Sequence, residues 1–260
     1  MKSPQALKKS GGRLARIIKM SAAMAMILAA AMVLLLVHDG LRLYLLAKNS
    51  AVLIKNTTPF ARNEPPAARK ILVLGDSTAF GTGAAHPENS TAGRLAARYP
   101  DAAVVNLAVN GLRIAGLLDL LKTIHEKTPY DLILIQIGAN DIIRLTPLRE
   151  IETGINEVLA RTALLGQKVI ILHSGDVGEA PLFPWYFRGW LSRRSRAVRE
   201  IYIRAAPAHG AEYVDLIDSP VAHQLRENTK IYYANDLLHL TDEGYGLWFE
   251  EIQKHLEPHL

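Results

Sequence analysis

The chain has 260 residues, of which 49% are hydrophobic and 21% charged, so it can form one sizeable α/β core with an appendage and is neither disordered nor fibrous. It contains no cysteine, which excludes disulfides, thiolate metal sites and a cysteine nucleophile. The net charge of +5 does not indicate a nucleic-acid partner, because residues 1–19 contain no acidic residue and carry six basic ones, Lys2, Lys8, Lys9, Arg13, Arg16 and Lys19. The rest of the chain is close to neutral, and we expect no nucleic acid to bind.

The N-terminal segment predicts a membrane anchor. Met20 to Val37 contains no charged side chain and spans about 27 Å as a helix, which could continue to Leu46. A cleaved signal peptide is the alternative, but its apolar region usually has roughly 7–15 residues and ends at a small-x-small site, whereas this one ends at Val37-His-Asp-Gly40. The basic residues 1–19 then form a cytoplasmic tail, with the main domain on the periplasmic side of the inner membrane.

The remainder of the chain predicts a linker and one domain. Residues 47–69 have no consistent period and contain several prolines, which is typical of a linker. From residue 70 to residue 260 apolar runs alternate with helical patterns: strands are expected at 70–75, 102–108, 131–138, 168–173 and 211–216, and helices near 90–99, 112–126, 148–165, 191–208 and 242–256. This alternation predicts a three-layer α/β/α domain with a five-stranded, mostly parallel sheet.

Ser77 is the first candidate catalytic residue. It follows the buried run Ile71 to Gly75, and open α/β sheets carry out their chemistry in the crevice beyond the carboxyl ends of the strands. Gly81 and Gly83 follow it closely and leave backbone N–H groups accessible to an oxyanion. The alternative is a simple strand-to-loop turn, since Gly-Asp-Ser is also turn chemistry.

Two further candidates follow the second and third expected strands. Gly111 offers an unobstructed backbone N–H, although it could equally be an ordinary glycine at a helix start. Asn140 could aim its carboxamide N–H into the crevice, and the alternative is that Asn140 or Asp141 caps the next helix.

A histidine with a nearby carboxylate lies close to the C-terminus. Asp236 precedes His239 by three positions, so its carboxylate can curl back to the Nδ1–H group and stabilise the imidazolium that forms when Nε2 takes a serine proton. Of the other histidines, only His173, which follows the fourth strand, could line the site and is a candidate for substrate binding. The pattern favours a serine nucleophile with a histidine base.

Taken together, these stretches resemble the ordered blocks of the SGNH hydrolases, also called GDSL esterases and lipases. The resemblance covers about residues 70 to 256 and rests on Gly75-Asp-Ser-Thr78, Gly111, Gly138-Ala-Asn140-Asp141 and Asp236-Leu-Leu-His239. It implies that Ser77 is the nucleophile, His239 the general base and then acid, and Asp236 the residue that orients His239. It further implies an oxyanion hole built from the backbone N–H groups of Ser77 and Gly111 and the side chain of Asn140.

The same resemblance implies a flavodoxin-like sheet of strand order 2-1-3-4-5. It also implies ester chemistry through an acyl-enzyme, without a metal or other cofactor. The chain departs from the family name at Thr78, where leucine would complete the GDSL string. Because this position flanks the nucleophile, we expect the change to affect packing or access more than mechanism.

An aromatic segment follows the fourth strand and should emerge on the same side of the sheet as Ser77. Its rings are Phe183, Trp185, Tyr186, Phe187 and Trp190, and several arginines follow them. The pattern suits an apolar acyl pocket or a segment at the membrane interface, with Trp185 and Phe187 as candidate substrate-binding residues. The alternative is that the rings close the domain core.

These features predict a membrane-anchored serine esterase that acts on lipid, lysophospholipid or small acyl esters. An alternative is an O-acetyl esterase or an acyltransferase acting on an envelope polysaccharide, because the catalytic residues do not reveal whether water or a sugar accepts the acyl group. An inactive membrane scaffold is a third hypothesis, and the presence of every expected catalytic residue argues against it.

Overall fold

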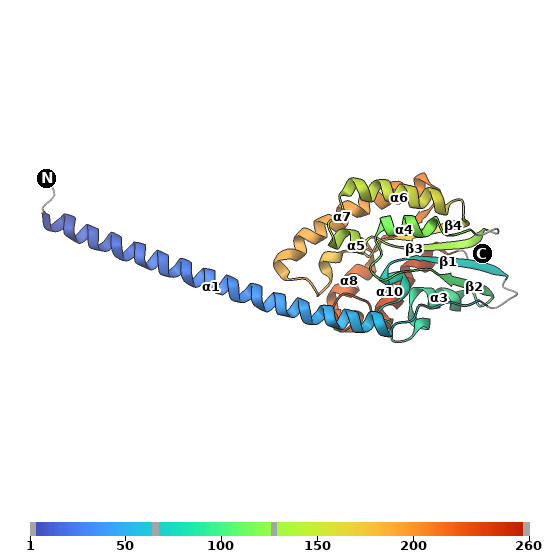
Figure 1. The fold of residues 1–260 in the computed structure, drawn as a ribbon, viewed down its shortest axis with the longest axis horizontal. Helices are drawn as coiled ribbons and strands as arrows, with labels where there is room; N and C mark the ends of the chain where they lie inside the picture. Colours follow the sequence, from blue (N-terminus) through green and yellow to red (C-terminus); the bar gives the residue numbers. More distant parts are fainter. Residues whose placement is uncertain (1–3, 64–67, 126–128, 257–260) are drawn as a thin grey trace. The chain divides into compact units, whose positions relative to one another are not determined.

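The computed structural model describes residues 4–63, 68–125 and 129–256, and it gives side-chain burial from residue 18 onward. The chain divides into two compact units between Leu45 and Leu46. Helix α1 (Pro4–Asn56) makes up the described part of the first unit and enters the second (Figure 1). Its segment Ile18–Asn56 contains an 18-residue window with a mean hydropathy of 2.5 and is, by length and composition, long and apolar enough to cross a membrane. The helix continues beyond Leu46, where irregular chain was expected, and its last turns are part of the second unit.

The second unit contains the expected parallel sheet. Its strands are β1 (Arg69–Gly75), β2 (Ala102–Asn106), β3 (Tyr130–Gln136), β4 (Gly166–Leu172) and β5 (Glu212–Tyr213). They lie in the order β2-β1-β3-β4-β5, and every neighbouring pair is parallel. The predicted fold class and strand order are therefore confirmed.

The last strand is shorter than the predicted range 211–216. Only Glu212 and Tyr213 pair with β4. Just beyond them, the carboxylate of Asp215 accepts hydrogen bonds from the backbone N–H groups of Ile217 and Asp218 at 3.0 and 3.3 Å. This local turn directs the chain away from the sheet.

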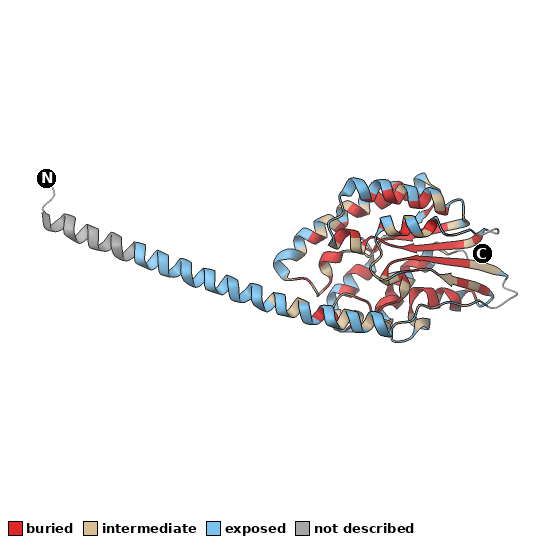
Figure 2. Ribbon diagram, viewed as in Figure 1, coloured by how far each residue is buried: buried red, intermediate tan, exposed pale blue. Residues whose placement is uncertain are grey.

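Helices cover both faces of the sheet, and its central strands are buried (Figure 2). Alternate residues of each central strand belong to two separate cores. Leu72, Leu74, Ile133 and Ile135 pack with α4 (Ile114–Leu121), α6 (Leu148–Thr162) and α7 (Trp185–Ala208). Ile71, Val73, Leu132 and Leu134 pack with α3 (Thr91–Arg98), α8 (Pro220–Glu227) and α10 (Asp242–Ile252). Burial on both faces explains why these strands read as continuous apolar runs.

Three differences from the expected helices affect the site. Helix α7 begins at Trp185 instead of residue 191, with Pro184 as its N-cap. Helices α8 and α9 (Thr229–Tyr232) occupy the stretch between β5 and the catalytic histidine candidate. Short helices α2 (Ser77–Phe80) and α5 (Ala139–Ile143) begin directly beyond β1 and β3.

Residues just after α1 also pack on the second unit. Arg62 forms an antiparallel bridge with Val104 of β2. Its guanidinium donates to the backbone carbonyls of Ala96, Tyr99 and Ala102 at 3.1, 2.7 and 3.0 Å. These contacts fix the described part of the expected linker against the edge of the sheet.

Candidate active site

Ser77 begins α2 immediately beyond β1, at the carboxyl edge of the sheet. The tight turn requires glycine at position 75, whose φ is +142° and where a Cβ would lie 1.9 Å from the carbonyl oxygen of Gln136. Asp76 caps the helix by accepting the backbone N–H of Thr78 at 2.9 Å, and the Thr78 hydroxyl donates to the same carboxylate oxygen at 2.8 Å. The threonine that replaces the family's leucine thus hydrogen-bonds to the residue before the nucleophile candidate.

Ser77, His239 and Asp236 form a continuous hydrogen-bonded chain. The Oγ atom of Ser77 lies 2.9 Å from Nε2 of His239, and Nδ1 of His239 lies 2.5 Å from Oδ2 of Asp236. Because an ionised carboxylate only accepts hydrogen bonds, Nδ1 carries the proton and Nε2 is free to accept the serine proton. This arrangement can activate the Ser77 hydroxyl as a nucleophile.

The Asp236 carboxylate is fully buried and saturated with hydrogen bonds. Its Oδ1 atom accepts the backbone N–H groups of Leu238 and His239 at 3.1 and 3.0 Å, in a turn where Leu237 has a φ of +61°. Burial by itself raises the pKa of Asp236, but the hydrogen bond and charge of His239 and a hydrogen bond from Ser50 outweigh it and lower the pKa to about 2. Asp236 is therefore a carboxylate at neutral pH.

Gly111 and Asn140 line the same cavity as Ser77 and His239. Gly111 has a φ of +75°, a backbone conformation that favours glycine. Asn140 is the second residue of α5, whose N-cap is Gly138 and carries no side-chain cap. Asp141 accepts the backbone N–H of Ile114, the first residue of α4, at 3.0 Å. A capping role thus belongs to Asp141 with respect to α4, and the Asn140 side chain is not the cap of α5.

The cavity has a volume of about 270 Å³. Its polar wall includes the triad serine and histidine together with Arg144, Ser174 and Asp176, while its apolar wall is made of Ile54, Ile143, Val177, Leu216, Ala222, Leu225, Tyr233, Leu238, Leu240 and Trp248. Such a mixture of an apolar chamber and a few convergent polar groups is typical of small-molecule sites.

His173 does not line this cavity; its neighbour Ser174 does. The His173 ring is fully buried, packs against Tyr202 and Tyr213, and has Nδ1 2.9 Å from the Tyr213 hydroxyl. Burial lowers the pKa of His173 to about 4, so the ring is neutral at pH 7. Its position two residues beyond Ile171, a core residue on the same side of β4, is the sequence signal for this inward orientation.

The aromatic segment lies at the start of α7 and is largely exposed. Trp185 is 77% and Phe187 40% exposed, whereas Phe183, just before the helix, is buried. The Trp185 and Tyr186 rings meet edge to face, and those of Phe187 and Trp190 stack at 5.1 Å. Neither Trp185 nor Phe187 lines the cavity, and their exposure shows that they do not close the core.

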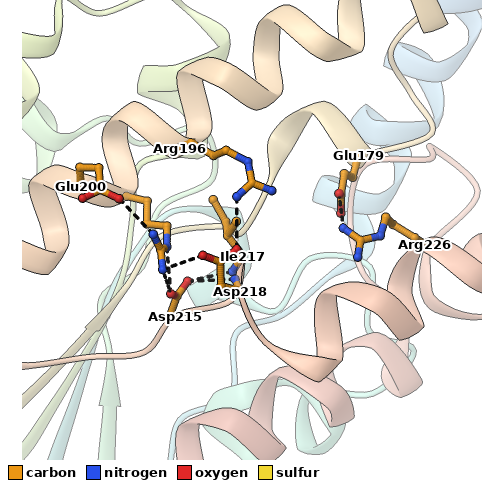
Figure 3. A network of polar contacts seen from close by, with 8 residues as sticks. Glu179, Arg196, Glu200, Asp215, Ile217, Asp218 and Arg226 are labelled. Carbon is orange, nitrogen blue, oxygen red and sulfur yellow. Dashed lines mark hydrogen bonds and ion pairs between the residues drawn. The ribbon is translucent and has the colours of Figure 1, made fainter.

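Arginines of α7 and α8 form ion pairs with acidic residues of the neighbouring loops (Figure 3). Arg199 of α7 binds Asp215 through Nε and a terminal nitrogen at 2.9 and 2.5 Å, and Arg196 contacts Asp218 at 3.2 Å. On the cavity wall, Glu179 accepts a hydrogen bond from Arg226 of α8 at 2.5 Å. These contacts connect α7 and α8 to the loops that shape the cavity.

Sequence reasoning missed two features of this site. Ser50 and Ile54, on the last turns of α1, line the cavity; no pattern in the sequence connects them with Ser77. The second feature is the buried carboxyl group of Asp76, next to Ser77: burial raises its pKa to about 6 despite the hydrogen bonds from Thr78.

Among the described residues, no group of three or more His, Asp or Glu side chains is arranged to hold a metal ion.

Comparisons with known proteins identify the family and the fold. Residues 73–247 match the model of the GDSL-like lipase/acylhydrolase family. Among solved structures, a lipolytic protein of the G-D-S-L family from Veillonella parvula is similar over 74% of this chain and 100% of its own, with a TM-score of 0.61 and 17% identity. TesA shows the same coverage and TM-score with 20% identity. Axe2, an acetylxylan esterase from Geobacillus stearothermophilus, is similar over 74% of this chain and 96% of its own, with a TM-score of 0.52 and 21% identity. No curated protein sequence matches the chain.

Proposed function

This chain belongs to the GDSL-like lipase/acylhydrolase family, a family of serine ester hydrolases, and from that premise we propose that it is a membrane-anchored esterase whose nucleophile is Ser77. The observation that carries the proposal is the hydrogen-bonded chain from Ser77 through His239 to Asp236, which opens into the 270 Å³ cavity.

The reaction begins when Ser77 Oγ attacks the carbonyl carbon of an ester. Nε2 of His239 takes the hydroxyl proton, and the buried Asp236 carboxylate stabilises the imidazolium that results. The tetrahedral intermediate then collapses, the C–O bond to the alcohol breaks, and His239 returns the proton to the leaving oxygen. In the second half of the reaction, His239 takes a proton from water as the water attacks the acyl-enzyme. The bond between the acyl carbon and Ser77 Oγ then breaks, the carboxylic acid leaves, and His239 returns the proton to Ser77.

The negative charge of the tetrahedral intermediate requires donors near Ser77. We assign this role to three donors: the backbone N–H groups of Ser77 and Gly111 and the carboxamide of Asn140. All three residues line the cavity. Donors fixed in position before the reaction stabilise the developing oxyanion without further reorganisation.

The cavity supports a substrate with a short or medium acyl group. Its volume of about 270 Å³ is slightly below the 300–1,000 Å³ of typical small-molecule pockets. The apolar residues of α8 and the loop before α10, among them Leu225 and Leu238, would surround the acyl chain. We assign to this site those lipid, lysophospholipid or small acyl esters whose acyl group is short or medium in length.

The N-terminal segment supports an uncleaved anchor in the cytoplasmic membrane. Its apolar helix follows six basic residues with no acidic one, which favours a cytoplasmic N-terminus and a periplasmic esterase domain. Protease added to spheroplasts that express the full chain should digest the domain. Protection of the domain would contradict this orientation, and a mature N-terminus beyond residue 40 would show that the segment is cleaved.

The catalytic assignment is tested with the purified full-length protein in detergent. A fluorophosphonate should label the wild type and not Ser77→Ala, and Ser77→Ala should lose ester hydrolysis while its circular dichroism spectrum is unchanged. Ser174→Ala is the matched control, because it removes another cavity hydroxyl outside the triad, and it should still be labelled. Full activity in Ser77→Ala would contradict the assignment of Ser77 as the nucleophile.

A panel of p-nitrophenyl esters from acetate to palmitate then defines the acyl group. We expect the highest kcat/KM for short and medium chains, in line with the cavity volume. Activity confined to the acetyl ester would instead support the alternative, an O-acetyl esterase or acyltransferase that acts on an envelope polysaccharide. Appearance of an acylated sugar when an oligosaccharide is added would distinguish transfer from hydrolysis.

A further inference from the structure

The last turns of α1 contact the carboxylate of the triad. The hydroxyl of Ser50 donates to Oδ2 of Asp236 at 2.6 Å, although 186 residues separate the two in sequence. This oxygen is the same one that Nδ1 of His239 contacts at 2.5 Å. A residue outside the family-matched range 73–247 therefore hydrogen-bonds directly to the triad.

The contact is part of a helix face that packs on the esterase domain. Leu46 is buried, and Ser50 and Ile54, which follow at intervals of four, line the cavity. Residues four apart lie above one another on one side of a helix. Next to Ser50, the Asn49 side chain donates to the backbone carbonyl of Asn235 at 3.1 Å. The helix is thus held against the loop that carries Asp236 by more than one contact.

Ser50 completes the hydrogen bonding of a buried charge. Oδ1 of Asp236 accepts two backbone N–H groups, and Oδ2 accepts from His239 and Ser50. A buried carboxylate that lacks a donor is costly, and a hydrogen bond to a charged group is stronger than one between neutral groups. The Ser50 hydroxyl also restricts rotation of the carboxylate, so that Oδ2 stays directed at the imidazole.

We propose that Ser50 is a positioning residue of the triad, and that the end of α1, which follows the predicted anchor, is therefore a part of the active site. This inference rests on the proposed function, because it assigns Ser50 a role through Asp236. Ser50 acts through Asp236, which in turn orients His239; the hydroxyl of Ser50 donates to the carboxylate. Only Ala47 to Asn49 separate Ser50 from Leu46, where the predicted membrane anchor ends.

The test compares variants of the full-length protein in detergent, with p-nitrophenyl butyrate hydrolysis and the rate of fluorophosphonate labelling as readouts. Ser50→Ala should lower kcat about tenfold and slow labelling by a similar factor while KM changes less than twofold, because the lost contact supports the triad and not substrate binding. Ser50→Thr keeps the hydroxyl and should restore most of the rate.

Asn49→Ala is the matched control for docking of the helix. It removes a hydrogen bond to the same loop that does not involve Asp236. We expect it to lower the melting temperature, by less than Ser50→Ala because the lost bond is exposed and neutral, and to leave kcat within twofold of wild type. A double-mutant cycle gives the second control: in an Asp236→Ala background, Ser50→Ala should change kcat less than twofold, because its partner is absent.

Several results would overturn the inference. They are a Ser50→Ala variant with wild-type kcat and labelling rate, an equal loss of kcat in Asn49→Ala, or a tenfold effect of Ser50→Ala that persists without Asp236. Each of these leaves the esterase assignment intact, because the wild type would still be active and Ser77→Ala inactive. A wild type that is neither labelled nor active, or a fully active Ser77→Ala variant, would overturn the proposed function itself.

Discussion

Nε2 of His239 lies 2.9 Å from Oγ of Ser77, although 162 residues separate them in the chain. The two segments approach closely because Gly83, with a φ of +98°, lies against the histidine loop: a Cβ at this glycine would lie 2.4 Å from the carbonyl oxygen of Leu240 and 3.0 Å from Cβ of His239. The position of His239, the proposed base, relative to Ser77, the proposed nucleophile, thus depends on the absence of a side chain at residue 83.

Gly83→Ala should therefore displace His239. We expect kcat to fall at least tenfold and the free energy of unfolding to fall by about 2 kcal/mol or more, because the methyl group meets backbone and the φ is unfavourable for alanine. Gly210→Ala is the matched control: its φ is +68°, but a Cβ there meets nothing within 4 Å, so only stability should decrease. Wild-type kcat in Gly83→Ala would contradict this account.

Asn140→Ala should lower kcat by roughly 10²–10³ with little change in KM, because an oxyanion contact strengthens only as negative charge develops. Its melting temperature should stay close to that of the wild type, since no side chain caps α5. The two quantities are measured on the same purified variant by steady-state kinetics and thermal unfolding. A lower melting temperature with unchanged kcat would indicate a structural role instead.

Asp76→Asn should change the pH dependence of stability. Burial raises the pKa of Asp76 from 3.8 to about 6 in the folded protein, so between these values the folded state holds a proton that the unfolded state has released. The wild type consequently loses stability as the pH rises from 4 to 7, by about 3 kcal/mol at most. The variant lacks this loss, so its melting temperature relative to wild type should rise over this range. If the melting temperatures of wild type and variant changed in parallel from pH 4 to pH 7, the raised pKa of Asp76 would be contradicted.

The exposed aromatic residues at the start of α7 support a role at a lipid interface. If they contact aggregated substrate, Trp185→Ala and Phe187→Ala should lower kcat/KM for long-chain esters in mixed micelles several-fold, and for soluble acetyl esters hardly at all. Their melting temperatures should change little, because both side chains are exposed. Leu164→Ala, which removes an 86% exposed apolar side chain just before β4, is the control and should affect neither substrate. Equal losses on both substrates would contradict the interfacial role.

Much of the fold could be predicted because its signals are local. Ile71 to Leu74 and Leu132 to Ile135 are apolar at every position, as strands buried on both faces must be, and the structure pairs them as neighbours in the sheet. The limits of β5 were predicted less well, because the Asp215 carboxylate bonds the backbone of the next residues and ends the strand early. Hydrophobic periodicity does not reveal that a side chain competes with the neighbouring strand for backbone hydrogen bonds.

The sequence by itself determined the succession of strands and helices along the chain, the Ser77 turn and the Asp236–His239 pair, because each depends on residues only a few positions apart. Tertiary structure alone decided the contact of the His173 ring with Tyr202 and Tyr213, the exposure of Trp185 and the contact between Ser50 and Asp236. The physical reason is the same in all three cases: burial and hydrogen bonding at these positions depend on segments far apart in the chain, which meet only when the helices pack on the sheet. For Ser50 that distance is 186 residues, well beyond the range of any periodicity or capping rule.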